Sequence, residues 1–430
     1  MGISMKERIR GLDDVKIILY SWGANNEHVL ADNLTKLGFE VIFFQKECRH
    51  YTRDMELAME LIPFIHGKQA KAVVSFNYFP ILSMICNTCQ IPYYAWVYDC
   101  PHFTLYAKQI QLPCNYIGVF DREMVRNLEN YGVGTAFHAP LAADAAYFGR
   151  MIGQASEAEK KRFRCDVSFV GSLYTDEHNY YDGLKNSESD RCVDMDLLIR
   201  QQCFCYGEDY LRRALSEGRL DLAMIREKMA DQGLMLGEDY FAEEEDILMA
   251  AVLEKKVTVE ERRMLLTKLA QGSRASDRNH IDEAAGTDRA AYAGYTFRLY
   301  TGSAANGLPE LDRCNCGTVD YHTQMPLVFA GSRINLNISL RSIRSGIPLR
   351  VLDIMACGGF VLTNRQPEVT EYFTEGVEIV TFDSLEDCVE KVRYYLAHEE
   401  ERRRIAEAGR RKVEETFSYE AGLARLFDGV

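Results

Sequence analysis

Long apolar runs are missing from this sequence. None approaches the roughly 20 residues that a membrane-spanning helix needs, so we expect no integral membrane segment. Residues 1–14 are charged and lack the apolar core of a secretory signal, which favours a cytoplasmic location. Basic residues are in the minority, because 50 Lys and Arg face 64 Asp and Glu and leave a net charge of −14. That negative field disfavours nucleic acid as a partner.

Common catalytic motifs are also absent. There is no G-x-x-x-x-G-K-[ST], which excludes a P-loop, and no expected strand is followed by a full G-x-G-x-x-G, which excludes the dinucleotide fingerprint. Neither H-E-x-x-H nor G-x-S-x-G occurs. The 13 cysteines are an odd number with no second pair at zinc-ribbon spacing. We therefore expect reduced thiols and no bound metal.

Short apolar runs that alternate with helical patterns make up the first part of the chain. Such runs, when continuous rather than alternating, are typical of a parallel sheet covered on both faces. We expect strands at 15–21, 39–44, 72–76, 93–98, 116–120 and 135–138. This pattern predicts a doubly wound, Rossmann-like domain over residues 1–150.

A second α/β unit follows residues 149–164, a polar, lysine-rich stretch that we interpret as a linker. Its strands are expected at 166–170, 296–300, 334–338, 360–363 and 378–382. Residues 175–290 carry Glu, Arg, Lys, Leu and Ala at helical spacing, which predicts an all-helical insertion. The second domain then spans 163–430, and we expect its final helix, about 418–428, to pack back on the first domain. Two such domains form a cleft, and ligands bind at the carboxyl ends of the strands.

The most informative segment is 334–373. A basic residue, Arg350, falls near the start of a helix that ends at Gly358-Gly359. A cation there opposes the helix dipole at a cost of a few tenths to about 1 kcal/mol, unless an anion binds to both. Asp353 shares a helix face with Arg350. It could accept from a ribose diol, or simply pair with Arg350 on a solvated surface.

The chain resembles the GT-B glycosyltransferases, in particular the bacterial CgeB-like, family 1-like group with its associated N-terminal domain. The resemblance covers nearly the whole chain except the helical insertion. The stretches that carry it are residues 96–102 (WVYDCPH), 140–142 (PLA), 166–172 (DVSFVGS), 317–322 (GTVDYH), 325–326 (MP), 348–358 with its Ala356-Cys357-Gly358 ending, and 366–373.

The resemblance implies a nucleotide-diphosphate-sugar donor in the C-terminal domain, and a UDP-sugar is the donor that we expect. A hydroxyl of a protein, glycan or small molecule would be the acceptor, in the N-terminal domain, and catalysis would need no metal. By position, Asp353 would contact the ribose, and Arg350 with Gly171 or Ser172 would hold the diphosphate. The remaining residues expected to bind the donor are Tyr321, His322, Arg341, Arg344 and Ser345. We expect Arg341, Arg344 and Arg350 to mark one basic pocket.

The catalytic base is harder to assign. Many retaining members of the fold carry Glu-x7-Glu, and Ser345 stands where the first Glu would fall, which argues against that chemistry. Asp99 and His102 follow an expected strand and are our candidates for the base. Asp99 could instead cap the following turn and His102 could be packed. We expect Asp121 to cap the helix that follows it, and His138 to have a structural role.

Two other functions stay open at this point. One is a catalytically silent scaffold that uses the helical insertion to bind a partner. The other is a nucleotide-sugar epimerase of the same fold, which would need no acceptor.

Overall fold

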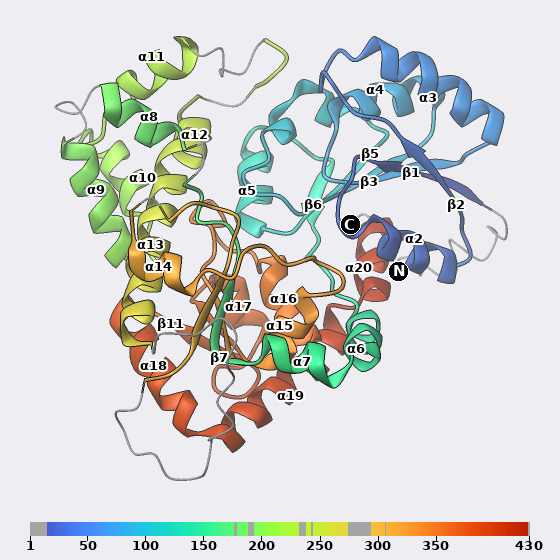
Figure 1. Ribbon diagram of the computed structural model, residues 1–430. Helices are drawn as coiled ribbons and strands as arrows, with labels where there is room; N and C mark the ends of the chain where they lie inside the picture. The colour runs from blue at the N-terminus through green and yellow to red at the C-terminus, as the bar shows by residue number, and fades with distance from the viewer. Residues whose placement is uncertain are drawn as a thin grey trace.

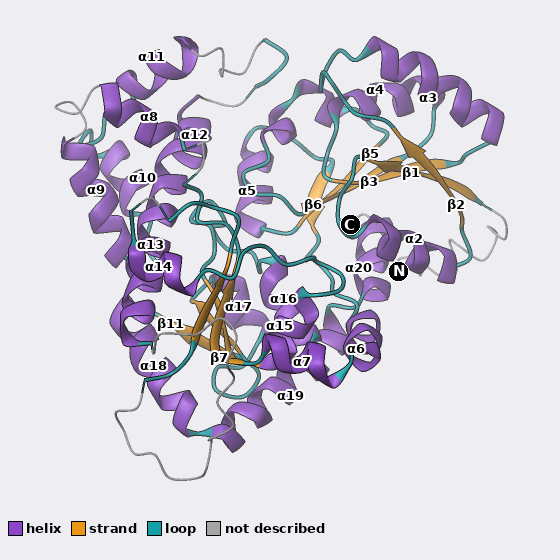
Figure 2. Ribbon diagram, viewed as in Figure 1, coloured by secondary structure: helices purple, strands orange, loops and turns teal. Residues whose placement is uncertain are grey.

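The computed structural model describes residues 15–175, 179–187, 193–231, 238–241, 244–273, 294–305 and 307–428. Residues 1–14 and residues 274–290 of the expected insertion therefore lie outside the described residues. Within them, the chain forms two parallel sheets, each flanked by helices (Figures 1 and 2). The two predicted doubly wound units are thus present.

The N-terminal sheet has the strand order β2-β1-β3-β4-β5-β6, and every neighbouring pair is parallel. Alternate residues of β1 enter different cores, since Ile17 and Leu19 belong to one apolar cluster and Ile18 and Tyr20 to the other. The strands are β1 (Lys16–Ser21), β2 (Glu40–Gln45), β3 (Ala72–Phe76), β4 (Tyr93–Val97), β5 (Asn115–Val119) and β6 (Ala136–His138). The helices between them are α2 (Glu27–Lys36), α3 (Met55–Lys68), α4 (Pro80–Cys89), the 3₁₀ turns η1 (Phe103–Tyr106) and η2 (Lys108–Gln111), and α5 (Arg122–Asn130).

The C-terminal sheet has the order β11-β10-β9-β7-β8 and is also parallel throughout. Its strands are β7 (Cys165–Val170), β8 (Phe297–Tyr300), β9 (Ser332–Asn337), β10 (Val361–Asn364) and β11 (Val380–Phe382). Its helices after β8 are α14 (Pro309–Cys314), α15 (Met325–Gly331), α16 (Leu349–Ala356), α17 (Pro367–Tyr372), α18 (Leu385–Ala397), α19 (Glu399–Thr416) and α20 (Tyr419–Asp428). Every strand expected from the sequence is present, with its ends shifted by at most two residues.

The residues that the structure describes between β7 and β8 are mainly helical, and their helices are drawn in green and yellow in Figure 1. They are α8 (Tyr180–Ser187), α9 (Val193–Phe204), α10 (Tyr210–Ser216), α11 (Ala223–Asp231), α12 (Glu244–Leu248), the π-helical turn η4 (Met249–Glu254) and α13 (Lys255–Gly272). They bury an apolar cluster of their own. The segment also reaches the N-terminal domain, where Lys108 N donates to Asp239 O at 2.9 Å and Asp239 pairs with Arg53.

The expected linker at 149–164 is wrong, because these residues lie in α6 (Ala145–Gln154) and α7 (Glu157–Phe163). Local signals explain the helices: Asp144 caps α6, and Ser156 forms a capping box with Glu159 at the start of α7. Phe163 is buried, so a polar stretch with a few well-spaced apolar residues forms packed helices rather than a free connection.

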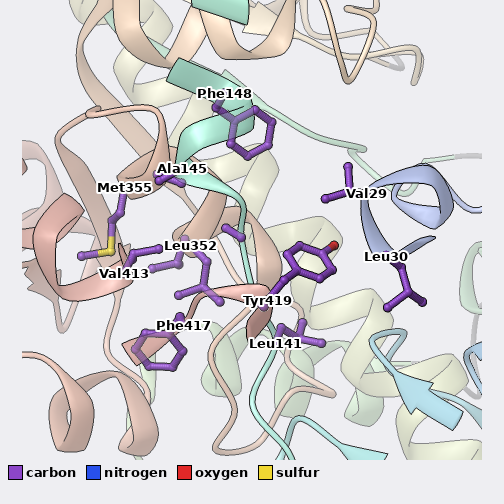
Figure 3. Packing of buried hydrophobic residues seen from close by; sticks show 14 of the residues in the cluster. Val29, Leu30, Leu141, Ala145, Phe148, Leu352, Met355, Val413, Phe417 and Tyr419 are labelled. Carbon is purple, nitrogen blue, oxygen red and sulfur yellow. The ribbon is translucent and has the colours of Figure 1, made fainter. Parts of the chain in front are cut away.

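The last helix, α20, leaves the C-terminal domain and packs on α2, β4 and β5 of the N-terminal domain (Figure 1). One apolar cluster consequently spans both domains, and Figure 3 shows Tyr419 of α20 between Leu352 of α16 and Leu30 of α2. A Cβ on Gly422 would overlap the Trp96 ring, so only glycine allows α20 to lie this close to the sheet. Among the described helices, none has the length and apolar character to cross a bilayer.

Candidate functional site

A pocket of about 410 Å³ lies between the two domains at the carboxyl ends of their strands. Aromatic rings dominate its walls, with few polar groups, which is typical of a small-molecule site. We call it the aromatic pocket, and its lining residues are Asn25, Asn26, Phe76, Trp96, Tyr98, Leu141, Ala142, Tyr321, Leu349 and Tyr419. The loop after β1, the carboxyl ends of β3 and β4 and the segment after β6 form one side, and the start of α16 forms part of the other.

Arg350 lies in the first turn of α16, next to the aromatic pocket. Its guanidinium contacts Met325 Sδ and lies 5.6 Å from the centre of the Phe329 ring. No carboxylate in the described part of the chain forms an ion pair with it. A half-buried cation that forms no ion pair among the described residues, at the positive end of a helix, is suited to bind an anion.

A second buried cation, Arg262 of α13, lies under the loops after β7 and β9. Its two terminal nitrogens donate to Ser172 O and Ile338 O, both at 2.5 Å, while its Nε has no partner among the described residues. Burial lowers its pKa, and the nearby charge of Arg350 acts in the same direction. Arg262 therefore connects the predicted residue Ser172 with the Arg350 region. No sequence signal marks it, because it stands in a helix that is rich in mixed charge.

Gly171 and Ser172 form the loop that Arg262 holds. Gly171 N donates to Tyr300 O at 3.0 Å, and Ser172 Oγ lies 3.0 Å from Ser303 Oγ and accepts from Tyr174 N at 2.8 Å. These contacts fix the turn that follows β7.

Asp353 is buried, with 1% of its surface exposed, and both of its carboxylate oxygens lie 3.1 Å from the Tyr321 hydroxyl. Burial raises its pKa to about 7, although Arg350 and the Tyr321 hydrogen bond favour the charged form. Tyr321 in turn accepts from Asn26 Nδ2 at 2.9 Å, and His322 Nε2 lies 2.7 Å from Asn25 O. The predicted residues Asp353, Tyr321 and His322 thus meet the loop after β1 of the other domain.

The loop before α16 presents three consecutive backbone N–H groups to one carboxylate. Asp121 Oδ2 accepts from Arg344 N at 2.7 Å, Ser345 N at 3.0 Å and Gly346 N at 3.1 Å. Such a nest binds anions, and here the anion belongs to the N-terminal domain. Asp121 also caps α5, as we expected from the sequence.

Ser345 is part of a polar network that crosses the domain boundary. Its Oγ lies 2.9 Å from Asp121 Oδ1 and 2.7 Å from Glu368 Oε1, and Glu368 Oε2 lies 2.7 Å from His138 Nε2. Burial would raise the pKa of Glu368, but its hydrogen bonds to His138, Arg122 N and Ser345 outweigh burial and lower it.

The expectation that Arg341, Arg344 and Arg350 form one basic pocket is wrong. Arg341 is buried against the Glu261 carboxylate, with Nε 2.9 Å from Oε2, and its guanidinium stacks 4.4 Å from the Tyr206 ring centre. Arg344 lies 4.0 Å from Asp209 Oδ2. The insertion supplies all three of these partners, and its acidic side chains neutralise the two arginines.

The two candidate bases differ in their exposure and in their hydrogen-bond partners within the protein. Asp99 is exposed after β4, and its Oδ2 accepts from Asn77 Nδ2 at 2.6 Å. His102 Nε2 lies 3.1 Å from Tyr78 N and 2.8 Å from Thr104 Oγ1, and burial lowers its pKa. The geometry leaves Asp99 accessible and gives His102 backbone partners.

Among the described residues, no group of three or more His, Cys, Asp or Glu side chains is placed to hold a metal ion. The cysteines that the structure describes are free thiols.

Residues 288–428 match the model of a family described as glycosyl transferase-like. No curated protein matches the sequence. Several solved structures share the fold over almost the whole chain at low identity. A glycosyltransferase from Rickettsia africae aligns with a TM-score of 0.53 at 11% identity, over 97% of each chain.

Two further solved structures give the same result. HepE of Anabaena, in complex with UDP and glucose, aligns with a TM-score of 0.53 at 8% identity, over 97% of this chain and 100% of the other. A sucrose-phosphate synthase from Thermosynechococcus elongatus aligns with a TM-score of 0.52 at 10% identity, over 96% and 97%. The predicted GT-B architecture is thereby confirmed.

Proposed function

We propose that this protein is a glycosyltransferase that moves a sugar from a nucleotide-diphosphate donor to a hydroxyl acceptor. The observation that carries the proposal is Arg350, a half-buried guanidinium without a carboxylate partner at the start of α16. The glycosyl transferase-like match over 288–428 and the fold shared with a UDP-binding protein support the same class.

Arg350 and the start of α16 hold the diphosphate in this proposal. Arg262 adds a second positive charge beneath the loop that contains Gly171 and Ser172. A buried guanidinium keeps its charge where a lysine would lose it, which suits a site for phosphate oxygens. Asp353 with Tyr321 and His322 then lies beside the ribose or the base, and a UDP-sugar is the donor that we favour.

The acceptor enters the aromatic pocket, whose Phe76, Trp96 and Tyr98 belong to the N-terminal domain. Asp99 follows Tyr98 directly and remains our candidate for the base, because it is exposed and Asn77 fixes its orientation. His102 has a positioning role in this scheme. The reaction is proposed to run without metal.

Calorimetric titration of the full-length protein with UDP, GDP and dTDP, and with their glucose conjugates, tests the proposal. UDP should bind, and Arg350→Ala should reduce the free energy of UDP binding by about 1–3 kcal/mol, the value of a charge-assisted contact. Arg411→Ala, which removes an exposed arginine paired with Glu407 on α19, is the matched control and should leave the affinity unchanged. A folded protein that binds none of these nucleotides would contradict the proposal.

A silent scaffold is the second candidate, and one observation favours it. The N–H nest before α16 and the Asp353 carboxylate are both already occupied by residues of this chain, Asp121 and Tyr321. Mass spectrometry of UDP-glucose incubated with the protein separates the two functions. Hydrolysis or transfer that disappears in Asp99→Asn excludes the scaffold, whereas binding without any turnover favours it.

A further inference from the structure

A separate pocket of about 710 Å³ lies beside the edge strand β8 of the C-terminal domain. It shares no lining residue with the aromatic pocket. Its walls are Arg162, Phe163, Arg298, Tyr300, Arg313, Cys314, Asn315, Cys316, Thr318, Val319 and Gln324. We call it the arginine pocket.

Three arginines and no acidic residue line the arginine pocket, although the chain has 64 Asp and Glu against 50 Lys and Arg. Within the described residues, none of the three guanidinium groups forms an ion pair. Arg298 and Arg313 instead donate to the backbone carbonyls of Arg162 and Ala270, and Arg162 lies 5.5 Å from the Phe163 ring centre. Arg162 and Arg313 are exposed and Arg298 is partly buried, and an anion between the three like charges would offset their mutual repulsion.

Tyr300 gives a second, independent indication of a ligand. Its side chain is in the wall of the arginine pocket, only 4% of the residue is exposed, and its hydroxyl oxygen lies beside the Arg298 guanidinium, but its O–H donates to no acceptor among the described residues. Buried hydroxyl groups are almost always hydrogen-bonded. An oxygen acceptor held by Arg298 would supply the missing bond, because Arg298 lies two residues before Tyr300 on the same face of β8.

We propose that the arginine pocket binds a phosphorylated small molecule, with Arg162, Arg298 and Arg313 around the phosphate and the Tyr300 hydroxyl as a neutral donor. Guanidinium groups match phosphate oxygens in geometry and retain their charge. Asn315 and Gln324 offer amide groups for the rest of the ligand. This site is separate from the proposed donor site, since it lies beside the edge strand β8 and shares no lining residue with the aromatic pocket.

Calorimetry with inorganic pyrophosphate and with glucose 6-phosphate tests the proposal on the full-length protein. Each titration is run with and without saturating UDP. We expect binding that persists with UDP, weakens as salt is added, and falls at least tenfold in Arg298→Gln and in Arg313→Gln. Arg411→Gln is the control for loss of one exposed positive charge and should not change the affinity.

Several outcomes would overturn the proposal: binding of neither probe, equal affinity in all the arginine variants, or binding that UDP abolishes and Arg350→Gln removes. The last result would assign the phosphate to the donor site. If Arg298→Gln lowers the melting temperature, Arg298→Lys and Tyr300→Phe decide the question, because both keep the volume of the wall. Unchanged affinity in Tyr300→Phe together with Arg313→Gln would refute the site.

Discussion

Asp121 and Ser345 join the two domains through both oxygens of one carboxylate. Oδ2 accepts from Ser345 N at 3.0 Å, and Oδ1 lies 2.9 Å from Ser345 Oγ. Asp121 is fully buried, so these bonds are shielded from water. A residue that caps a helix in one domain therefore also holds the loop that precedes α16 in the other.

Replacement of Asp121 should consequently cost more than the loss of a helix cap. Asp121→Ala leaves N–H groups of both domains buried without acceptors, at about 1–3 kcal/mol for such groups and more where a charge is involved. We expect the free energy of unfolding to fall by about 3 kcal/mol. Urea denaturation measures the change.

Asp144 provides the matched control, because it caps α6 through Tyr147 N in the same way but lacks the contacts to the loop before α16. Asp144→Ala should cost about 1 kcal/mol, the usual value for a cap. Equal losses in the two variants would mean that the contact between Asp121 and Ser345 adds no stability.

Asp353 should make stability fall with rising pH. Burial raises its pKa from 3.8 to about 7, so between these values the folded chain holds a proton that the unfolded chain has released. The free energy of unfolding therefore decreases from about pH 4 to about pH 7 and is level above that range. Asp353→Asn removes the cost of ionising this buried carboxyl. The variant should therefore be more stable than the native chain at pH 8, by up to about 4 kcal/mol.

Asp320 should affect the pH dependence of stability in the opposite direction, so it serves as the comparison. Hydrogen bonds from Thr323 lower its pKa, so its contribution is present above its ordinary pKa and is lost as the pH falls through the lowered value. Asp320→Asn should lose stability at neutral pH. Thermal unfolding between pH 4 and pH 8 separates the two variants, and a native-like pH profile in Asp353→Asn would contradict the first.

The packing of α20 should depend on Gly422. A Cβ at this position overlaps the Trp96 ring, and overpacking of this kind costs about 1–3 kcal/mol. Gly422→Ala should therefore destabilise the chain. Gly153 of α6 is also helical but has no neighbouring heavy atom within 4 Å of an added Cβ, so Gly153→Ala should be neutral or slightly stabilising. The difference between the two melting temperatures checks the prediction.

The sheets were predictable from the sequence because buried parallel strands are short, apolar and regularly spaced, as in β3 and β9. The position of Arg350 near the start of a helix was also predictable, because Pro348 and Gly358 mark the two ends of that helix in the sequence. Contacts between distant segments were not predictable. Nothing in the sequence indicates that Glu261 neutralises Arg341 or that Tyr321 donates to Asp353, since these pairs form only when segments far apart in the sequence pack together.

Arg262 is the clearest of these unpredicted residues, and its role gives the last prediction. If its charge assists diphosphate binding, Arg262→Lys should lower the affinity for UDP at least tenfold. A lysine amine cannot bond to Ser172 O and Ile338 O together, and it loses its charge more readily when buried.

Uridine, which has no phosphate, should bind the native chain and the Arg262→Lys variant with the same affinity. A general collapse of the site would instead lower the affinity for both UDP and uridine. The adjacent Arg263 is paired with Glu260, so Arg263→Lys is the control at a neighbouring position and should leave both affinities as they are. Equal losses for UDP and uridine in Arg262→Lys would show that Arg262 only supports the loops. A selective loss of UDP affinity would instead place a phosphate-binding charge on the helical insertion, which would then be part of the donor site.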